Sequence, residues 1–168
     1  MKFHSNHQES LKLEPMTELN YWLMKSEPDA YSIKDLRTEK ETLWDGIRNY
    51  QARNFMRSMK IGDRAFFYHS NTKPPGIVGL MEITETNLID PYQFDESSKY
   101  YDKKSKRENP RWDCVKTKYI CEFKKMITLK ELAEDYSSEE LILVRKGNRL
   151  SIMPIQKNIA EELLKKLN

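Results

Sequence analysis

The chain has 168 residues, enough for one well-buried core but few for two full domains, so we expect one domain over residues 21–168 behind an N-terminal tail of residues 1–20. Hydrophobic residues make up 38% of the sequence and charged residues 33%, with a mean hydropathy of -0.82, a composition that excludes a disordered or membrane-inserted chain. The net charge of +3 at pH 7 is too small to indicate a partner by itself.

Short apolar runs separated by turn residues open the domain. Residues 21–25 form an apolar run that the turn residues at positions 26–29 cut off, which predicts a buried strand. Ser32, with Asp35 three residues later, has the capping-box pattern that predicts the start of a short helix. A break over residues 38–42 then separates this helix from the elements that follow.

A second helix and a pair of strands come next. The helix is predicted to begin at Arg48 or Asn49 and to end before Gly62. Aromatic residues concentrate within positions 63–69 and predict a strand, and a loop leads from it into another strand over residues 77–84. We expect these two strands to pair as neighbours.

The second half carries a long polar segment between strands. Residues 90–110 are rich in Lys, Ser, Asp and Tyr and predict a surface loop of the kind that often carries function. Alternating apolar and charged residues predict a strand over residues 113–123. The remaining predicted elements are a helix over 128–135, a short helix from Ser137 or Ser138 to Leu143, a strand over 150–153 and a helix that Pro154 opens. We therefore expect an α+β domain around a mixed, partly closed sheet.

The cysteines and short motifs predict neither a disulfide nor a catalytic centre. Cys114 and Cys121 lie seven positions apart in one predicted strand, roughly 23 Å at about 3.3 Å per residue, which is too far for a disulfide. The odd separation also sends them to opposite faces, which disfavours a shared metal ion. The sequence has no P-loop and no GxGxxG pattern. We therefore expect no metal, no cofactor and no enzymatic activity.

The sequence favours a location inside the cell. The first 20 residues are mostly polar and lack the continuous apolar stretch of a secretory signal. No segment approaches transmembrane length, so we expect no membrane partner. We expect a cytoplasmic protein, or a nuclear one in a eukaryotic cell.

Positive charge is concentrated in two stretches. Residues 44–64 hold five basic and two acidic side chains, and residues 99–125 hold ten basic and four acidic ones, so these stretches carry +9 and the remainder -6. Such segregation suits a basic surface that meets phosphate. Solvated Lys and Arg on loops and strand edges are an equally consistent interpretation of the charge alone.

Six sequence blocks, in order along the chain, resemble the signatures of EVE-domain proteins. These blocks are residues 22–28, 44–54, 67–71, 75–79, 109–112 and 149–154. The resemblance covers about residue 21 to residue 167 and is strongest to the branch that includes thymocyte nuclear protein. It implies a PUA-like mixed, partly closed β-barrel with flanking short helices, related to the YTH readers of methylated RNA. It also implies a cleft that accepts a modified base. We therefore expect a non-catalytic, monomeric module that binds DNA or RNA carrying a methylated or otherwise modified cytosine or adenine.

Trp22 and Trp44 are the candidate walls of a base pocket. A methyl group adds apolar area to a base, and stacking the base between aromatic faces is a simple way to sense it. Each tryptophan sits beside polar residues in its block, although core packing is the competing interpretation for either ring. We expect at least one of the two rings to face a water-accessible slot.

Polar and basic residues in the same blocks are candidates for the base edge and for phosphate. The candidates for hydrogen bonds to the base edge are Ser26, Asn49, Tyr68, His69 and Ser70, of which Asn49 is also a candidate helix cap. The candidates for phosphate contacts are Lys25, Arg48, Arg53 and Arg57, of which Arg57 also fits a solvated helix face.

Two further segments complete the predicted ligand-binding set. Gly76 and Gly79 flank Ile77 and leave a segment poor in side chains, which lets another backbone or a flat ligand approach closely. Arg111 and Trp112 are candidates for a lid or an outer stacking platform, and packing of Trp112 against the barrel is the alternative.

Two other functions stay open. One is an enzyme that acts on nucleic acid or nucleotides in the same cleft, with Glu27 or His69 as the group that transfers a proton. His69 and Ser70 are adjacent and point to opposite faces of an extended strand, which disfavours a nucleophile and base pair. The other is a protein-interaction adaptor whose basic stretch binds an acidic partner.

Overall fold

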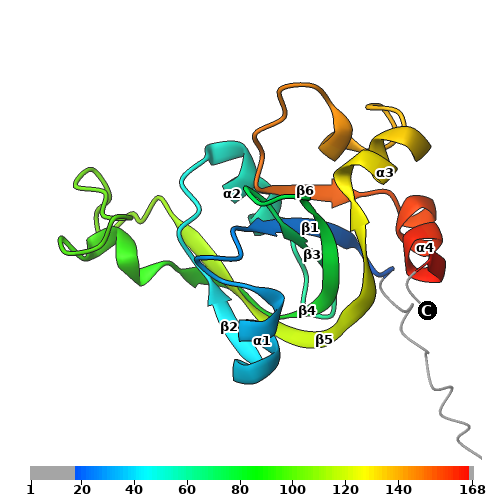
Figure 1. Cartoon of the computed structure of the whole chain (residues 1–168). Helices are drawn as coiled ribbons and strands as arrows, with labels where there is room; N and C mark the ends of the chain where they lie inside the picture. Colours follow the sequence, from blue (N-terminus) through cyan, green and yellow to red (C-terminus); the bar gives the residue numbers. More distant parts are fainter. Residues whose placement is uncertain (1–17, 167–168) are drawn as a thin grey trace, which may run out of the picture.

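The computed structural model describes residues 18–166, so most of the predicted tail lies outside the described residues. Within that range the strands form one mixed six-stranded sheet in the order β2-β5-β4-β3-β1-β6. The strands are β1 Tyr21–Ser26, β2 Glu41–Trp44, β3 Arg64–His69, β4 Gly76–Ile89, β5 Asp113–Thr128 and β6 Ile152–Ile155. The pair β1 and β3 is parallel and the other neighbours are antiparallel. The sheet bends strongly (Figure 1), but no hydrogen-bonded pairing of β2 with β6 closes it among the described strands. The expected mixed, partly closed sheet is confirmed.

Four α-helices flank the sheet in the described part of the chain. They are α1 Ile33–Glu39, α2 Tyr50–Arg57, α3 Leu129–Asp135 and α4 Lys157–Lys166, with short 3-10 turns at η1 Pro91–Phe94 and η2 Ile142–Val144. Ser32 and Thr128 both form complete capping boxes, and the Asn49 side chain accepts the Ala52 N–H at 3.0 Å at the start of α2. These caps satisfy backbone donors that a first turn leaves free, and they fix where each predicted helix begins.

Both faces of the central strands are buried, which explains why these strands read as continuous apolar runs. On one face Trp22 and Met24 of β1 pack with Phe67 and with the apolar sides of α1 and α2. On the other face Leu23 and Phe66 pack with residues of α3, η2 and α4. Successive residues of one strand therefore pack into two separate hydrophobic cores, one on each face of the sheet. The helices α1 and α2 cover one core, and α3 and α4 cover the other.

The strands β4 and β5 are longer than predicted and form one bent antiparallel hairpin. Their pairing extends to Ile89 and Asp113 with several register shifts, so the hairpin carries the loop of residues 90–110 at its end. In Figure 1 this loop, drawn in green, projects from the side of the sheet. The predicted surface loop is confirmed, and the 90–110 loop is anchored at a hairpin end that lies beside β2.

Three local expectations were wrong. The segment over residues 41–44 is an edge strand, β2, which sequence patterning misses because it is short, polar and paired to β5 alone. Pro154 opens no helix; it lies in β6 opposite Trp22, at a sheet edge where a missing N–H is tolerated. No α-helix runs from Ser137 or Ser138 to Leu143: residues 137–141 form a single turn, with hydrogen bonds between Ser137 and Glu140, and the 3-10 turn η2 begins at Ile142.

Candidate functional site

A cleft of about 760 Å³ opens where β1, β2 and β3 end, and we call it the lateral cleft. Its lining comes from the end of β1, from β2 and the segment after it, from the loop after β3, from the 90–110 loop and from the segment before β6. These parts contribute residues 25–27, 30–31, 42–47, 70–71 and 99–100, together with Arg149 and Ser151. Its volume falls within the range of small-molecule sites.

The wall at the end of β1 is held by a tight turn. The Ser26 hydroxyl donates to the Tyr31 carbonyl at 2.6 Å, and the Glu27 carbonyl accepts the N–H groups of Ala30 and Tyr31 at 3.0 and 2.9 Å. Lys25 is partly buried beside this turn, and burial lowers the pKa of its ammonium group. Predicted base-edge residue Ser26 thus lies at the cleft, although its own proton is already donated inside the protein.

Trp44, the last residue of β2, and Asp45, the residue after it, both line the cleft. Trp44 is 7% exposed, and its ring meets Phe67 edge-on with 5.3 Å between ring centroids. Asp45 is half-buried, and burial raises the pKa of its carboxyl group, with a further increase from the negative charge of Asp90 and a decrease from Arg48. Among the described residues, the Asp45 side chain takes part in no hydrogen bond or ion pair.

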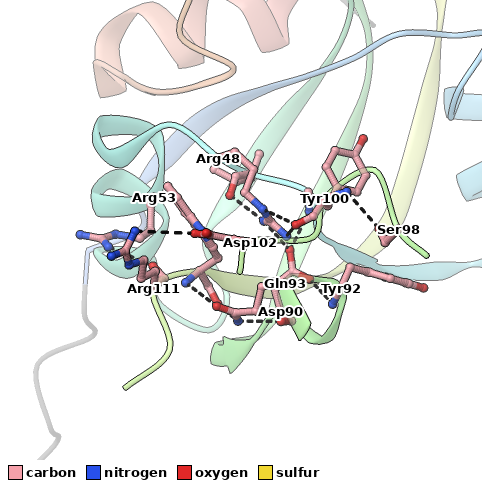
Figure 2. Close-up of polar contacts among 12 residues, drawn as sticks. Arg48, Arg53, Asp90, Tyr92, Gln93, Ser98, Tyr100, Asp102 and Arg111 are labelled. Atoms are coloured by element: carbon pink, nitrogen blue, oxygen red, sulfur yellow. Dashed lines mark hydrogen bonds and ion pairs between the residues drawn. The ribbon is translucent and has the colours of Figure 1, made fainter. Parts of the chain in front are cut away.

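Arg48 ties the 90–110 loop to the cleft. Its guanidinium donates to the Tyr100 carbonyl at 3.0 and 2.8 Å and to Asp90 Oδ2 at 2.9 Å, as Figure 2 shows. Gly46 has φ +77°, and a Cβ there would lie 2.7 Å from the Tyr100 ring. Predicted as a phosphate contact, Arg48 instead uses its donors to hold Tyr100 at the cleft edge.

A second aromatic layer lies behind the loop. Tyr50 stacks on Trp112 with 4.9 Å between centroids, and the Trp112 Nε1–H donates to Asp102 Oδ2 at 2.8 Å. Trp112 is 5% exposed, so its ring is packed, whereas Tyr50 is 51% exposed. Arg53 donates to the Arg111 carbonyl at 2.9 Å and lies over the Tyr50 ring. The predicted stacking platform, Trp112, is therefore packed, and the exposed ring beside it is Tyr50, which sequence patterning did not single out.

Trp22 and His69 lie away from the lateral cleft. The Trp22 indole is 5% exposed, packs beside Phe55 and donates its Nε1–H to Asp63 Oδ2 at 2.9 Å. His69 Nε2 accepts the Ile33 N–H at 3.1 Å, and burial lowers the pKa of its imidazole. A neutral His69 therefore supports the first turn of α1.

Other predicted site residues serve the sheet and the helices. Tyr68 is 3% exposed, and burial raises the pKa of its hydroxyl to about 12. A Cβ on Gly76 would lie 2.8 Å from Met126 Cγ and would collide with the Ile127 carbonyl, so the glycine admits the backbone of β5. Ile77 is fully buried against α3 and η2, and Asn49 caps α2.

The lateral cleft thus gathers four of the predicted ligand-binding residues, Lys25, Ser26, Trp44 and Ser70. It adds residues that sequence patterning passed over, above all Asp45, Asn71, Lys99 and Tyr100. Asp45 could have been found, because it follows Trp44 directly in one signature block. Lys99 and Tyr100 carry no local signal, since only the fold of the 90–110 loop brings them to the cleft.

Residues 18–166 contain no helix that is long and apolar enough to span a bilayer. Within the same range, no group of three or more His, Cys, Asp or Glu side chains is placed to hold a metal ion. Cys114 and Cys121 are both free thiols, as their spacing predicts, and burial raises the pKa of each.

The sequence matches known proteins along most of its length. A family model described as the EVE domain matches residues 20–166. Thymocyte nuclear protein 1 of Mus musculus is 50% identical over 124 residues, which make up 67% of this chain and 55% of the mouse protein. The chain therefore spans about half the length of that relative.

Solved structures share the fold. A protein from Pseudomonas syringae has a TM-score of 0.84 and 43% identity, over 88% of this chain and 99% of that one. Human THYN1, solved in complex with 5-methylcytosine containing DNA, has a TM-score of 0.83 and 38% identity, over 89% of this chain and 98% of that one. Both cover nearly all of the described residues.

Proposed function

The chain belongs to the EVE domain family, and we propose that it binds nucleic acid and receives one modified base in the lateral cleft. The observation that carries this proposal is the cleft itself, about 760 Å³ in volume, with the Trp44 ring beside polar groups in its lining. The similarity to human THYN1, solved with 5-methylcytosine containing DNA, supports it. A base in a duplex must leave its stack to reach such a site.

The lining offers what an extruded base needs. Stacking on an aromatic ring contributes about 1 to 3 kcal/mol per base, and hydrogen bonds to the base edge add discrimination of similar size. Trp44 and Tyr100 supply aromatic surface, while Asp45, Ser70 and Asn71 supply polar groups for the edge. We propose Trp44 as the main stacking surface.

Basic residues surround the same opening. Lys25, Lys99 and Arg149 line the cleft, and the 90–110 loop beyond Lys99 adds further lysines and an arginine. Contacts from such residues to phosphate orient a strand without reading its sequence. We propose that the 90–110 loop follows the backbone on one side of the extruded base.

We propose binding without turnover. The His69 ring nitrogen Nε2 is occupied by a backbone N–H and lies outside the cleft lining, which weakens its case as a proton-transfer group. The name of the mouse relative favours a nuclear location over a cytoplasmic one in a cell that has a nucleus. A monomer suffices, because one chain supplies every part of the cleft.

The experiment is a fluorescence-anisotropy panel of otherwise identical oligonucleotides, single-stranded and duplex, DNA and RNA. The panel carries cytosine, 5-methylcytosine, adenine or N6-methyladenine at one position. We expect tighter binding of at least one modified strand. Absence of binding at low salt would favour the protein-interaction adaptor, and strand turnover that depends on Glu27 would favour the enzyme.

Two tryptophan variants locate the stacking surface. Trp44→Leu keeps an apolar side chain but removes the ring, and we expect it to reduce the preference for the modified base about tenfold. Trp22→Phe removes the hydrogen bond to Asp63 from a ring outside the cleft, and we expect that preference to persist. The reverse pattern would contradict the placement of the base at Trp44. Circular dichroism checks that both variants fold.

A further inference from the structure

Reading a methyl group cannot by itself separate 5-methylcytosine from thymine. Both bases carry the same methyl group on C5. They differ at position 4, where cytosine has an amino donor and thymine an oxo acceptor, and at N3, which carries a hydrogen only in thymine. A cleft that senses only the methyl group would therefore fill with thymine. Selection requires a group in the lining that faces position 4 or the neighbouring N3, and this requirement rests on the proposed function.

We propose that the Asp45 carboxylate selects bases with an exocyclic amino group in the lateral cleft, by accepting a hydrogen bond from that group. The shared chemistry is an amino donor beside an unprotonated ring nitrogen, which cytosine and adenine both have. Thymine presents an oxygen at the same place and is repelled by the carboxylate.

The position of Asp45 is the first observation that carries this inference. It follows Trp44 directly at the end of β2, and both residues line the cleft. Because both residues line one cleft, a base held in it lies near the Asp45 side chain in this proposal. Ser70 and Asn71, which belong to the loop after β3, line the same cleft.

The second observation is that Asp45 lacks the donors that the chain gives its other buried aspartates. Asp90, fully buried, accepts from Arg48, the Gly46 N–H and the Tyr92 N–H. Asp63, 2% exposed, accepts from Trp22, the Lys60 N–H and the Asn20 N–H. Asp45 is half-buried and receives no such bond from the described residues. Among the described residues no side-chain oxygen without a partner is sealed from solvent, so the Asp45 carboxylate is accessible to water or to a ligand in the cleft.

The cations near Asp45 do not satisfy it. Arg48 lowers the pKa of Asp45 through its charge, yet its guanidinium donates to Asp90, Tyr100 and the Ile47 carbonyl. The negative charge of Asp90 acts in the opposite sense. The cleft lining thus holds two acidic residues, the half-buried Asp45 and the exposed Glu27, among the basic residues Lys25, Lys99 and Arg149. A carboxylate suits the donor edge of a base and repels phosphate, so the base edge is its natural ligand.

The test compares bases that differ by exchange of an amino group for an oxo group, which also adds a hydrogen to the neighbouring ring nitrogen. Strands carry 5-methylcytosine or thymine at one position, and a second pair carries adenine or hypoxanthine, which differ in the same amino-to-oxo sense. We expect the native protein to prefer the amino member of the pair it accepts by about tenfold or more. The pair that shows the preference tells whether the cleft takes a pyrimidine or a purine.

Asp45→Asn is the decisive variant, because the amide has the shape of the carboxylate but can donate to an oxo group. In this variant we expect the ratio of the affinity for the amino base to that for the oxo base to fall close to one or to drop below it. The matched control is Asp29→Asn, an exposed aspartate of the turn after β1 that lies outside the cleft lining and loses the same charge. We expect the control to keep the native preference.

A third base tests the native protein without any mutation. 5-Methylpyrimidin-2-one keeps the methyl group and the ring nitrogen of 5-methylcytosine but lacks the amino group, and we expect it to bind about tenfold more weakly. If the native protein binds none of these strands, the proposed function itself is overturned. A native preference that Asp45→Asn retains, or that Asp29→Asn loses equally, would overturn the role of Asp45 and leave the proposed function standing.

Discussion

Arg48 donates through Nη1 to the carboxylate of Asp90 at 2.9 Å, and this buried ion pair joins the segment after β2 to the start of the 90–110 loop. The Asp90 side chain is fully buried, and the Arg48 side chain is 22% exposed. Because Arg48 also holds the Tyr100 carbonyl, the pair sets where the loop meets the lateral cleft. Figure 2 places Arg48 between Asp90 and Tyr100.

Arg48→Met is therefore expected to cost about 3 kcal/mol of unfolding free energy, because it leaves the Asp90 charge buried without its cation. Urea denaturation measures the loss. The control is Arg37→Met, which breaks the more exposed pair of Arg37 with Glu122 and is expected to cost less than about 1 kcal/mol. A small loss of stability with a flatter salt dependence of binding would instead support the phosphate role that the sequence suggested for Arg48.

Local patterns predicted most of the elements but few of the cleft contacts. Ser32, Asn49 and Thr128 cap helices because capping depends on residues three positions apart, which a sequence displays. By contrast, Trp22 and Trp44 look alike in sequence. A partner 41 residues away, Asp63, binds the Trp22 indole within the core, whereas Trp44 ends an edge strand whose existence depends on pairing with β5. Tertiary partners thus decide which tryptophan lines the lateral cleft.

The 90–110 loop is expected to supply phosphate contacts. Lys103→Ala together with Lys104→Ala should weaken binding of every strand by a similar factor and leave the preference between bases unchanged. The slope of log K against log salt should become shallower by about 0.7 to 0.9 for each phosphate that the variant no longer neutralises. Titrations at several salt concentrations measure this slope.

The control for these lysines is Lys130→Ala with Lys165→Ala. These residues belong to α3 and α4, which Figure 1 shows on the far side of the sheet from the 90–110 loop. The control removes the same charge from the whole molecule, so we expect an almost unchanged slope. Equal changes in both double variants would mean that net charge, and not the loop, accounts for the salt dependence.

His69 is expected to make stability fall on mild acidification. Burial lowers the pKa of its imidazole below the ordinary value near 6.5, so the unfolded chain binds the proton more readily than the folded one. Its contribution is fully present above the unfolded pKa and is lost as pH falls through the folded pKa. Thermal unfolding at pH 7.5 and 5.5 should show the decrease, and His69→Asn, which keeps an acceptor near the Ile33 N–H, should show a smaller one. An identical decrease in both proteins would assign the effect to other groups.

Gly79 is expected to be required for packing, not for ligand binding. A Cβ on Gly79 would lie 2.6 Å from Ile33 Cδ1 and 2.7 Å from the Cys121 carbonyl oxygen, so Gly79→Ala should cost about 1 to 3 kcal/mol. Ile33→Val removes the clashing methyl group, and in the Gly79→Ala background it should cost less than it does alone. The contacts with the Cys121 carbonyl oxygen and with Cγ1 of residue 33, 2.8 Å away, both stay, so the rescue should be partial. Gly62→Ala, where φ is +96° and no atom lies within 4 Å of the added Cβ, should show no such coupling with Ile33. If the stability costs of Gly79→Ala and Ile33→Val simply add in the double variant, the contact with Ile33 is not what excludes a side chain at position 79.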